Sequence, residues 1–105
     1  MSLIFLIQTT QDESSRRYYH YVSLEDFAEG AVTIYEENLA KRNEGVKSRV
    51  IYDLGDISNF YATIPDAALL IREPRLDNTY VPQGPHFIVD TVVRYMRRKA
   101  SQSVR

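Results

Sequence analysis

The stretch that most constrains the fold is the apolar run "LIFLI" near the start of the sequence. Successive side chains of a β-strand point to opposite faces of a sheet. In this run Leu3, Phe5 and Ile7 would face one way. Ile4 and Leu6 would then face the other. A small domain with helices on one side of its sheet needs only one apolar face, so the sequence raises the question of what covers the second.

Length and composition limit the class of protein. The 105 residues predict a single domain, and an apolar content of 44% is enough for a small core. The net charge of −1 makes general attraction to nucleic acid or to a membrane surface unexpected. The sequence has no cysteine, which excludes disulfides and thiolate chemistry and agrees with a reducing compartment. The apolar runs are too short for a membrane-spanning helix of roughly 20 residues, and the first lacks the basic lead of a signal peptide.

Hydrophobic periodicity and end signals predict seven elements in the order ββααββα. Ser23 with Asp26 three residues on is a variant of the capping box, so a long helix should begin there. The glycine within this helix, Gly30, would permit close packing on the sheet. The expected strands are residues 3–7, 16–23, 66–73 and 79–83. The expected helices are residues 23–42, residues 55–64 with Asp56 or Ser58 as the cap, and a last helix that begins at Pro85. Residues 46–54 are expected to hold a short extended piece.

This order predicts an α+β fold, a four-stranded antiparallel sheet with three helices on one face. The strand at residues 79–83 should lie at an edge, because Pro82 has no N–H to donate to a neighbour. The single domain is expected to span residues 1–100, and residues 101–105 are expected to form a basic, disordered tail.

Nothing in the chain is left to cover the other sheet face, and a second copy is the simplest partner. We therefore expect that face to be buried in a homodimer. The residues expected at the dimer contact are Ile4, Leu6 and Leu70, with Gln8 and Arg72 at its rim. Those expected under the helices are Leu3, Phe5, Ile7, Leu69 and Ile71. The opposite assignment of the two faces stays open at this point.

Residues with catalytic or metal-binding chemistry are sparse. His20 and His86 have no partners at the spacing of metal ligands. Glu37 and Lys41 are four residues apart, which is typical of an ion pair on a solvated helix face. The serines lie outside any GxSxG pattern, and the glycines form no phosphate-binding loop. We therefore expect no catalytic residue, no metal site and no cofactor, and hence no enzyme.

Two kinds of binding function remain. The basic end of the last helix and the tyrosines of residues 18–21 could bind RNA directly, but a solvated helix end explains the basic residues more simply. Tyrosines of this kind also line protein interfaces. An adaptor could present strand edges and aromatic pockets to short peptides. The residues expected to contact a partner are Tyr18, Tyr21, Phe60, Tyr61 and Tyr80.

Several stretches together resemble the enhancer of rudimentary homolog family, and the likeness covers nearly the whole chain. They are "MSLIFLIQ", "YYHYVSLEDFAEGAVTIYEENLAKRN" from Tyr18, "VIYDLGDISNF", the pair Tyr80 and Pro82, and "FIVDTVVRYMRRKA". The spacing of Glu29, Gly30, Tyr35, Glu36, Glu37 and Leu39 is quite specific. The acidic, serine-rich first loop departs from animal members, and the chain resembles a divergent, fungal member of the family.

The resemblance implies a homodimer formed through the sheets and a nuclear, non-enzymatic adaptor. It implies partners among RNA-processing proteins, reached through peptide segments, and in fungal members a YTH-type RNA-binding protein whose complex removes meiotic transcripts. RNA would then be contacted indirectly. Arg17 stands where animal members carry a phosphorylatable threonine. Ser23 is retained, and its acidic residue at +3 makes it a possible phosphorylation site.

Overall fold

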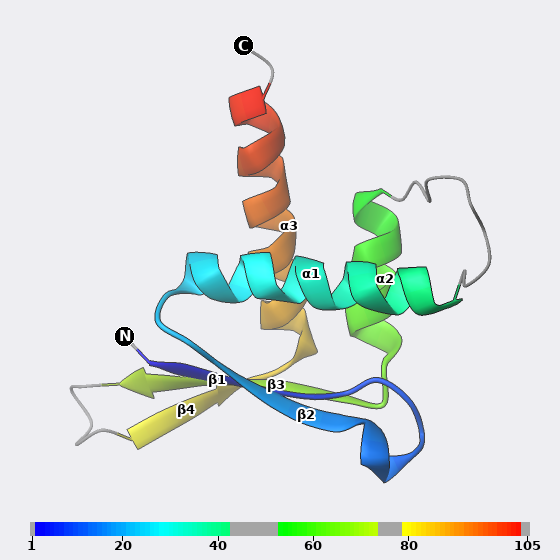
Figure 1. The fold of residues 1–105 in the computed structure, drawn as a ribbon. Coiled ribbons are helices and arrows are strands. Elements are labelled where there is room, and N and C mark those ends of the chain that lie inside the picture. The colour runs from blue at the N-terminus through cyan, green and yellow to red at the C-terminus, as the bar shows by residue number, and fades with distance from the viewer. Residues whose placement is uncertain (1, 43–52, 74–78, 104–105) are drawn as a thin grey trace.

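The computed structural model describes residues 2–42, 53–73 and 79–103. Within these residues the four strands form one antiparallel sheet and all three helices lie on the same side of it (Figure 1). The strands are β1 (Leu3–Gln8), β2 (Arg16–Tyr21), β3 (Asp66–Glu73) and β4 (Thr79–Gln83), and the helices are α1 (Leu24–Arg42), α2 (Leu54–Thr63) and α3 (Pro85–Ser103), with a 3₁₀ turn at Glu13–Ser15. The predicted α+β fold is confirmed.

The strand order is β2-β1-β3-β4, so the apolar run of β1 lies inside the sheet and pairs on both sides. Strand β4 lies at one edge, as the position of Pro82 predicted, and β2 lies at the other. The register places Ile4 opposite both His20 and Leu70, and it places Phe5 opposite Leu69. Alternation along these strands therefore puts two separate sets of side chains on the two faces of the sheet.

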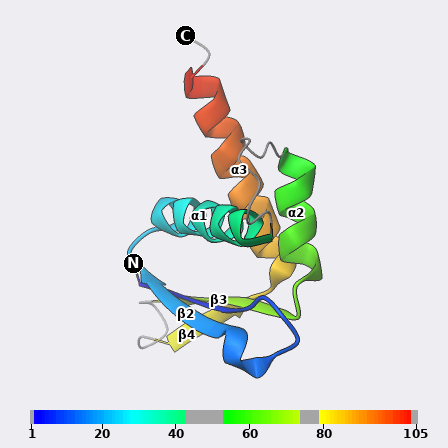
Figure 2. The same ribbon diagram turned by 45° about the vertical axis from the view of Figure 1, so that its right-hand side comes forward.

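One set lies under the helices and forms the core, as predicted. Phe5 is fully buried, and its ring meets that of Phe27 edge to face with centroids 5.0 Å apart. Helix α1 lies across the sheet, while α2 and α3 stand upright next to α1 (Figure 2). The predicted core-facing residues Leu3, Phe5, Ile7 and Leu69 are all buried, and Ile71 is partly buried against the same cluster.

Helix α1 begins where the sequence predicted. The Ser23 hydroxyl accepts a hydrogen bond from the Asp26 backbone N–H at 3.0 Å, which satisfies one of the free donors of the first turn. The ring of Tyr21 lies directly on Gly30, because a Cβ at Gly30 would come within 2.3 Å of the tyrosine hydroxyl. Glycine thus allows the close approach of helix and strand that was expected.

Helix α2 has a different cap from the one predicted. Asp53 is the N-cap: its side chain accepts from the backbone N–H of Asp56, and the Asp56 carboxylate accepts from the Asp53 N–H at 3.0 Å. Asp56 therefore completes a capping box from inside the helix, and Ser58 has no capping role. Most of the extended piece predicted at residues 46–54 lies outside the described residues.

Helix α3 begins at Pro85, as predicted, but it continues to Ser103. Residues 101–103, expected to belong to a disordered tail, are therefore helical. Figure 1 shows that the C-terminal part of α3 runs away from the sheet. In the part of the chain that the structure describes, no helix has the length and apolar character needed to cross a bilayer.

Candidate functional site

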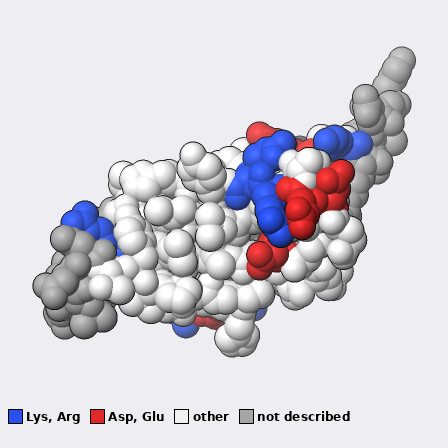
Figure 3. Space-filling view, turned by 90° about the horizontal axis from the view of Figure 1, so that it is seen from below, with Lys and Arg blue, Asp and Glu red and all other residues white. Residues whose placement is uncertain are grey.

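The sheet face turned away from the helices carries a cluster of apolar side chains, which we call the open sheet face. Leu6 is 41% exposed and Tyr18 is 76% exposed, although both are large hydrophobic residues on a regular strand. Figure 3 views the molecule from this side and shows few charges outside one mixed cluster. The side chains of the open sheet face, by strand register, are Ile4, Leu6, Tyr18, Ala68, Leu70, Tyr80 and Pro82.

At the end of this face near the β1–β2 loop, the polar groups bond to one another. Gln8 is only 8% exposed; its amide donates to the Thr10 carbonyl at 2.9 Å and accepts from Arg16 Nε at 2.9 Å. The Arg16 guanidinium also lies 3.7 Å from the Glu13 carboxylate. The predicted rim residue Gln8 is thus held in place by the loop.

At the opposite end, Ser2 joins two strands. Its hydroxyl lies 2.7 Å from His20 Nε2 and 3.1 Å from the Tyr80 hydroxyl. Arg72, the other predicted rim residue, is exposed at this end and is paired with Tyr80 in the sheet register. The open sheet face therefore has an apolar centre between two polar ends, which is the usual anatomy of a protein–protein interface.

A hollow of about 240 Å³ lies on the open sheet face beside Leu6 and Tyr18. Its remaining lining comes from Gln8, Arg16 and Asp66, with Ile7 and Arg17 behind. Tyr18 projects next to this hollow, so the face carries both a large protruding ring and a recess.

A larger groove of about 580 Å³ lies on the helix side, between α1, β2 and the β1–β2 loop; we call it the α1 groove. Its apolar lining comes from Ile7, Tyr19 and Ile34, and its rim includes Glu37 and Lys41. Strand β2 borders it and is an edge strand, so one side of its backbone has no strand neighbour among the described residues. Such an edge offers hydrogen bonds to an added strand.

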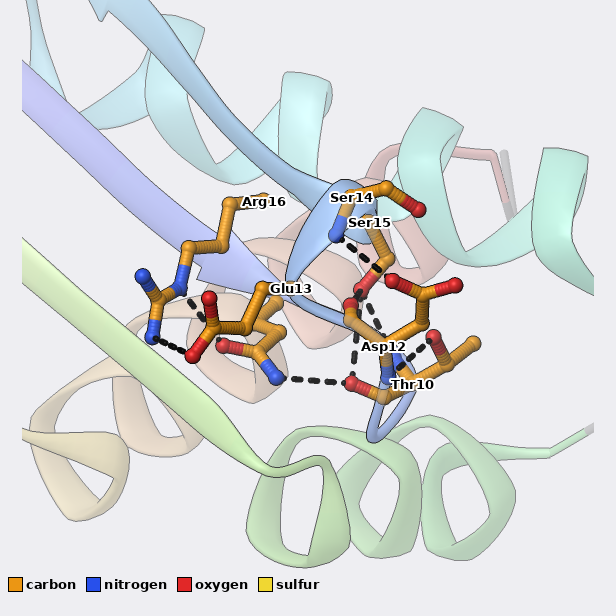
Figure 4. A network of polar contacts seen from close by, with 7 residues as sticks. Thr10, Asp12, Glu13, Ser14, Ser15 and Arg16 are labelled. Atoms are coloured by element: carbon orange, nitrogen blue, oxygen red, sulfur yellow. Dashed lines mark hydrogen bonds and ion pairs between the residues drawn. The ribbon is translucent and has the colours of Figure 1, made fainter.

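The loop wall of the α1 groove is ordered by short-range hydrogen bonds (Figure 4). The Ser15 hydroxyl donates to the Asp12 carbonyl at 2.7 Å, and the Asp12 carboxylate accepts from the Ser14 N–H at 2.9 Å. That contact with Ser14 lowers the pKa of Asp12. The Thr10 hydroxyl accepts from the Asp12 N–H at 3.2 Å. The groove therefore has a wall whose polar groups are already paired before a ligand arrives.

The basic end of α3 lies elsewhere. Arg98 is 3.7 Å from Glu25 of α1, and Arg94 is 3.1 Å from Asp90, so neighbouring carboxylates offset part of the positive charge. This end of the helix points away from the sheet (Figure 1). Tyr18, by contrast, lies opposite Leu6 in the strand register and so belongs to the open sheet face, on the side away from the helices. The tyrosine strand and the basic helix, which would bind RNA together in the alternative prediction, do not form one surface.

The five aromatic residues predicted to contact a partner fall into three places. Tyr18 and Tyr80 lie on the open sheet face, and Tyr21 is half-buried between Gly30 and Phe27. Phe60 and Tyr61 are 5% and 1% exposed, so both belong to the core and the prediction for them is wrong.

The role of Tyr61 within the core is visible in its contacts. Its hydroxyl donates to the Ala31 carbonyl and ties α2 to α1, and burial raises its pKa. The spacing of Ile57, Phe60 and Tyr61 is that of one helix face, and this was the signal in the sequence for burial. Sequence reasoning also missed Ser2, and it missed the α1 groove, whose walls come from segments far apart in the chain.

Among the described residues, no group of three histidine or acidic side chains is placed to bind a metal ion. His20 and His86 lie on different elements, one on β2 and the other on α3. The described residues carry two surface features of note, the open sheet face and the α1 groove.

Comparison with known proteins gives one consistent result. A family model described as "Enhancer of rudimentary" matches residues 1–102. The protein enhancer of rudimentary of Drosophila virilis is 30% identical over 97 residues, which is 92% of this chain and 91% of the relative. The enhancer of rudimentary homolog of Dictyostelium discoideum is 27% identical over 97 residues, covering 92% and 95%, and that of Caenorhabditis elegans is 27% identical over 99 residues, covering 91% of each.

Proposed function

Because the chain belongs to the enhancer of rudimentary family, we propose that it is a non-enzymatic, homodimeric adaptor of the nucleus that binds peptide segments of RNA-processing proteins. Its partner in this proposal is a YTH-type RNA-binding protein, and its task is to support the elimination of meiotic mRNAs. RNA would be reached through that partner.

The open sheet face is the observation that carries the proposed dimer. Leu6, Tyr18 and Tyr80 are large, apolar and exposed on a regular sheet, where an uncovered apolar cluster of this kind marks an interface. A two-fold contact would place each copy's Tyr18 against the other copy's face, where the hollow beside Leu6 can receive a ring. The paired polar groups at both ends suit the rim of such a contact.

The α1 groove supports the proposed peptide site. It lies on the helix side of β2, so a second copy on the open sheet face would leave it accessible. An extended segment could place apolar side chains on Tyr19 and Ile34 while its backbone follows the edge of β2. One dimer would then offer two equivalent grooves.

Sedimentation velocity of Leu6→Arg tests the dimer. Leu6 is already partly exposed, so the single chain should tolerate arginine, whereas a second copy would bury an unpaired charge. We expect wild type to be a dimer and Leu6→Arg to be a folded monomer. The matched control is Ala62→Arg, which adds the same charge at an exposed position of α2. A wild-type monomer, or a Leu6→Arg dimer as tight as wild type, would contradict the proposed interface.

Fluorescence anisotropy with overlapping peptides from the disordered part of a YTH-type protein tests the adaptor role. Asn38→Arg puts a long side chain into the α1 groove and should weaken binding at least tenfold, about 1.4 kcal/mol. Thr33→Arg, exposed on the same helix and outside the groove, should not. If no peptide binds, while the protein alone binds RNA with a steep salt dependence, direct RNA binding replaces the adaptor.

Phosphorylation of Ser23 stays a prediction. The hydroxyl is committed to the cap of α1, so a phosphate there would change the contact that starts the helix. Mapping of phosphorylated residues in cells checks it, and an unmodified Ser23 would remove it from the proposal.

A further inference from the structure

We propose that His20 makes the dimer sensitive to pH, so that the two copies separate as the solution becomes mildly acidic. This inference rests on the proposed function, because it takes the open sheet face as the dimer contact. The observation behind it is the hydrogen-bonded chain of Ser2, His20 and Tyr80 at one end of that face.

The three polar groups can be desolvated together while the imidazole is neutral. The Ser2 hydroxyl lies within hydrogen-bond distance of both His20 Nε2 and the Tyr80 hydroxyl, so each group has a partner within the same chain. Buried polar groups that satisfy one another cost little to cover, whereas an unpaired charge costs much more. A second copy can therefore cover neutral His20 at a lower cost than charged His20.

A proton on His20 changes this balance. The Ser2 hydroxyl can accept from a protonated Nε2, but it offers no negative charge to offset the imidazolium. The described neighbours of His20 carry no negative charge: Ile4 of β1 lies opposite it, and the Ser2 hydroxyl links it to the Tyr80 hydroxyl of β4. Among the described residues, Arg72 of β3 lies at this end of the face, opposite Tyr80 in the register, and its charge has the same sign as the imidazolium.

The two ends of the open sheet face therefore differ in their response to acid. At the loop end, Arg16 is charged at every relevant pH and has Glu13 within 3.7 Å. At the Ser2 end, histidine is the residue whose charge ordinarily changes between pH 5 and pH 8. A two-fold contact contains two such ends, so acidification adds two positive charges to one interface.

The magnitude follows from linkage. If covering the face disfavours the imidazolium about tenfold in each copy, the dimer dissociation constant rises about a hundredfold once both histidines are protonated. Sedimentation velocity at about pH 7.5, 6.5 and 5.5 at constant ionic strength measures this shift. Circular dichroism at each pH confirms that the chain stays folded.

The sequence contains only two histidines, which makes the control simple. His20→Gln should dimerise about equally well at all three pH values. His86→Gln removes the other imidazole, which is exposed at the start of α3, and should respond to pH as wild type does. A His86→Gln protein that loses the pH response would overturn the assignment to His20.

The outcomes separate this inference from the proposed dimer. A wild-type dimer whose dissociation constant is the same at all three pH values would refute the role of His20 and leave the interface standing. A wild-type chain that is monomeric even at about pH 7.5 would refute both. Persistence of the acid response in His20→Gln would refute the inference alone.

Discussion

The contact between Tyr21 and Gly30 predicts that a single methyl group has opposite effects in two backgrounds. Alanine in the middle of a helix is favoured over glycine by about 1 kcal/mol. In this chain, however, a Cβ at Gly30 would lie 2.3, 2.5 and 2.6 Å from three atoms of the Tyr21 side chain. No ordinary contact is that short, so the tyrosine or the helix must move.

The cost of that movement can be estimated from the surroundings of the ring. Tyr21 lies between Tyr19, at a centroid distance of 6.4 Å, and Phe27, at 6.0 Å, so it cannot swing away without losing both contacts. Overpacking of this kind costs about 1–3 kcal/mol. After the gain in helix propensity, Gly30→Ala should destabilise wild type by about 1 kcal/mol. In a Tyr21→Ala background the clash is gone, and the same change should stabilise by about 1 kcal/mol.

Urea unfolding followed by circular dichroism, at one fixed chain concentration, measures all four proteins of this double-mutant cycle. The expected coupling between the two positions is about 2 kcal/mol. Ala40→Gly, at an exposed position of α1, calibrates the propensity difference within this helix. The reasoning fails if Gly30→Ala stabilises wild type as much as it stabilises Tyr21→Ala, because the close approach would then be absent in solution.

Three further outcomes follow from the same structure, each measured by the same unfolding assay. Phe5→Ala should cost about 3–5 kcal/mol, because the ring is fully buried against Phe27. Asp53→Ala should cost about 1 kcal/mol by removing the cap of α2. Burial raises the pKa of Tyr61, so above about pH 10 the unfolded chain loses the tyrosine proton before the folded chain does, and stability falls. Tyr61→Phe should reduce this loss of stability at alkaline pH. At neutral pH the same change should cost about 1 kcal/mol, because the hydrogen bond to the Ala31 carbonyl is lost.

The parts of the fold that short-range patterns control could be predicted from the sequence. Alternation along β1 placed Phe5 in the core and Leu6 on the open sheet face, because a strand has a strict period of two. The start of α1 could be predicted because Ser23 stands three residues before Asp26, whose backbone N–H its hydroxyl caps. Pro82 placed β4 at an edge by the hydrogen bond that it cannot make.

Features that depend on the meeting of distant segments could not be predicted in this way. The hydrogen bonds that link His20, Ser2 and Tyr80 depend on the order of the strands in the sheet, which no local sequence pattern predicts. Residue type alone suggested that Phe60 would be a binding residue, although its helical spacing to Ile57 indicates a core position. The predicted cap of α2 was wrong because two aspartates, Asp53 and Asp56, flank the first turn, and both belong to one capping box.

The position of β1 inside the sheet has a consequence for synthesis of the protein. Strand β1 is made before the other three strands, and its neighbour β2 follows shortly after it. Its other neighbour, β3, exists only after residues 66–73 have been made. Until then a strand that is apolar on both faces keeps an unpaired backbone edge, which is the feature that aggregating chains share. The pairing of β1 with β3 joins segments separated by more than half of the chain, so it should form more slowly than the β1–β2 hairpin. This pairing should therefore set the rate at which the newly made protein stops exposing an aggregation-prone strand edge.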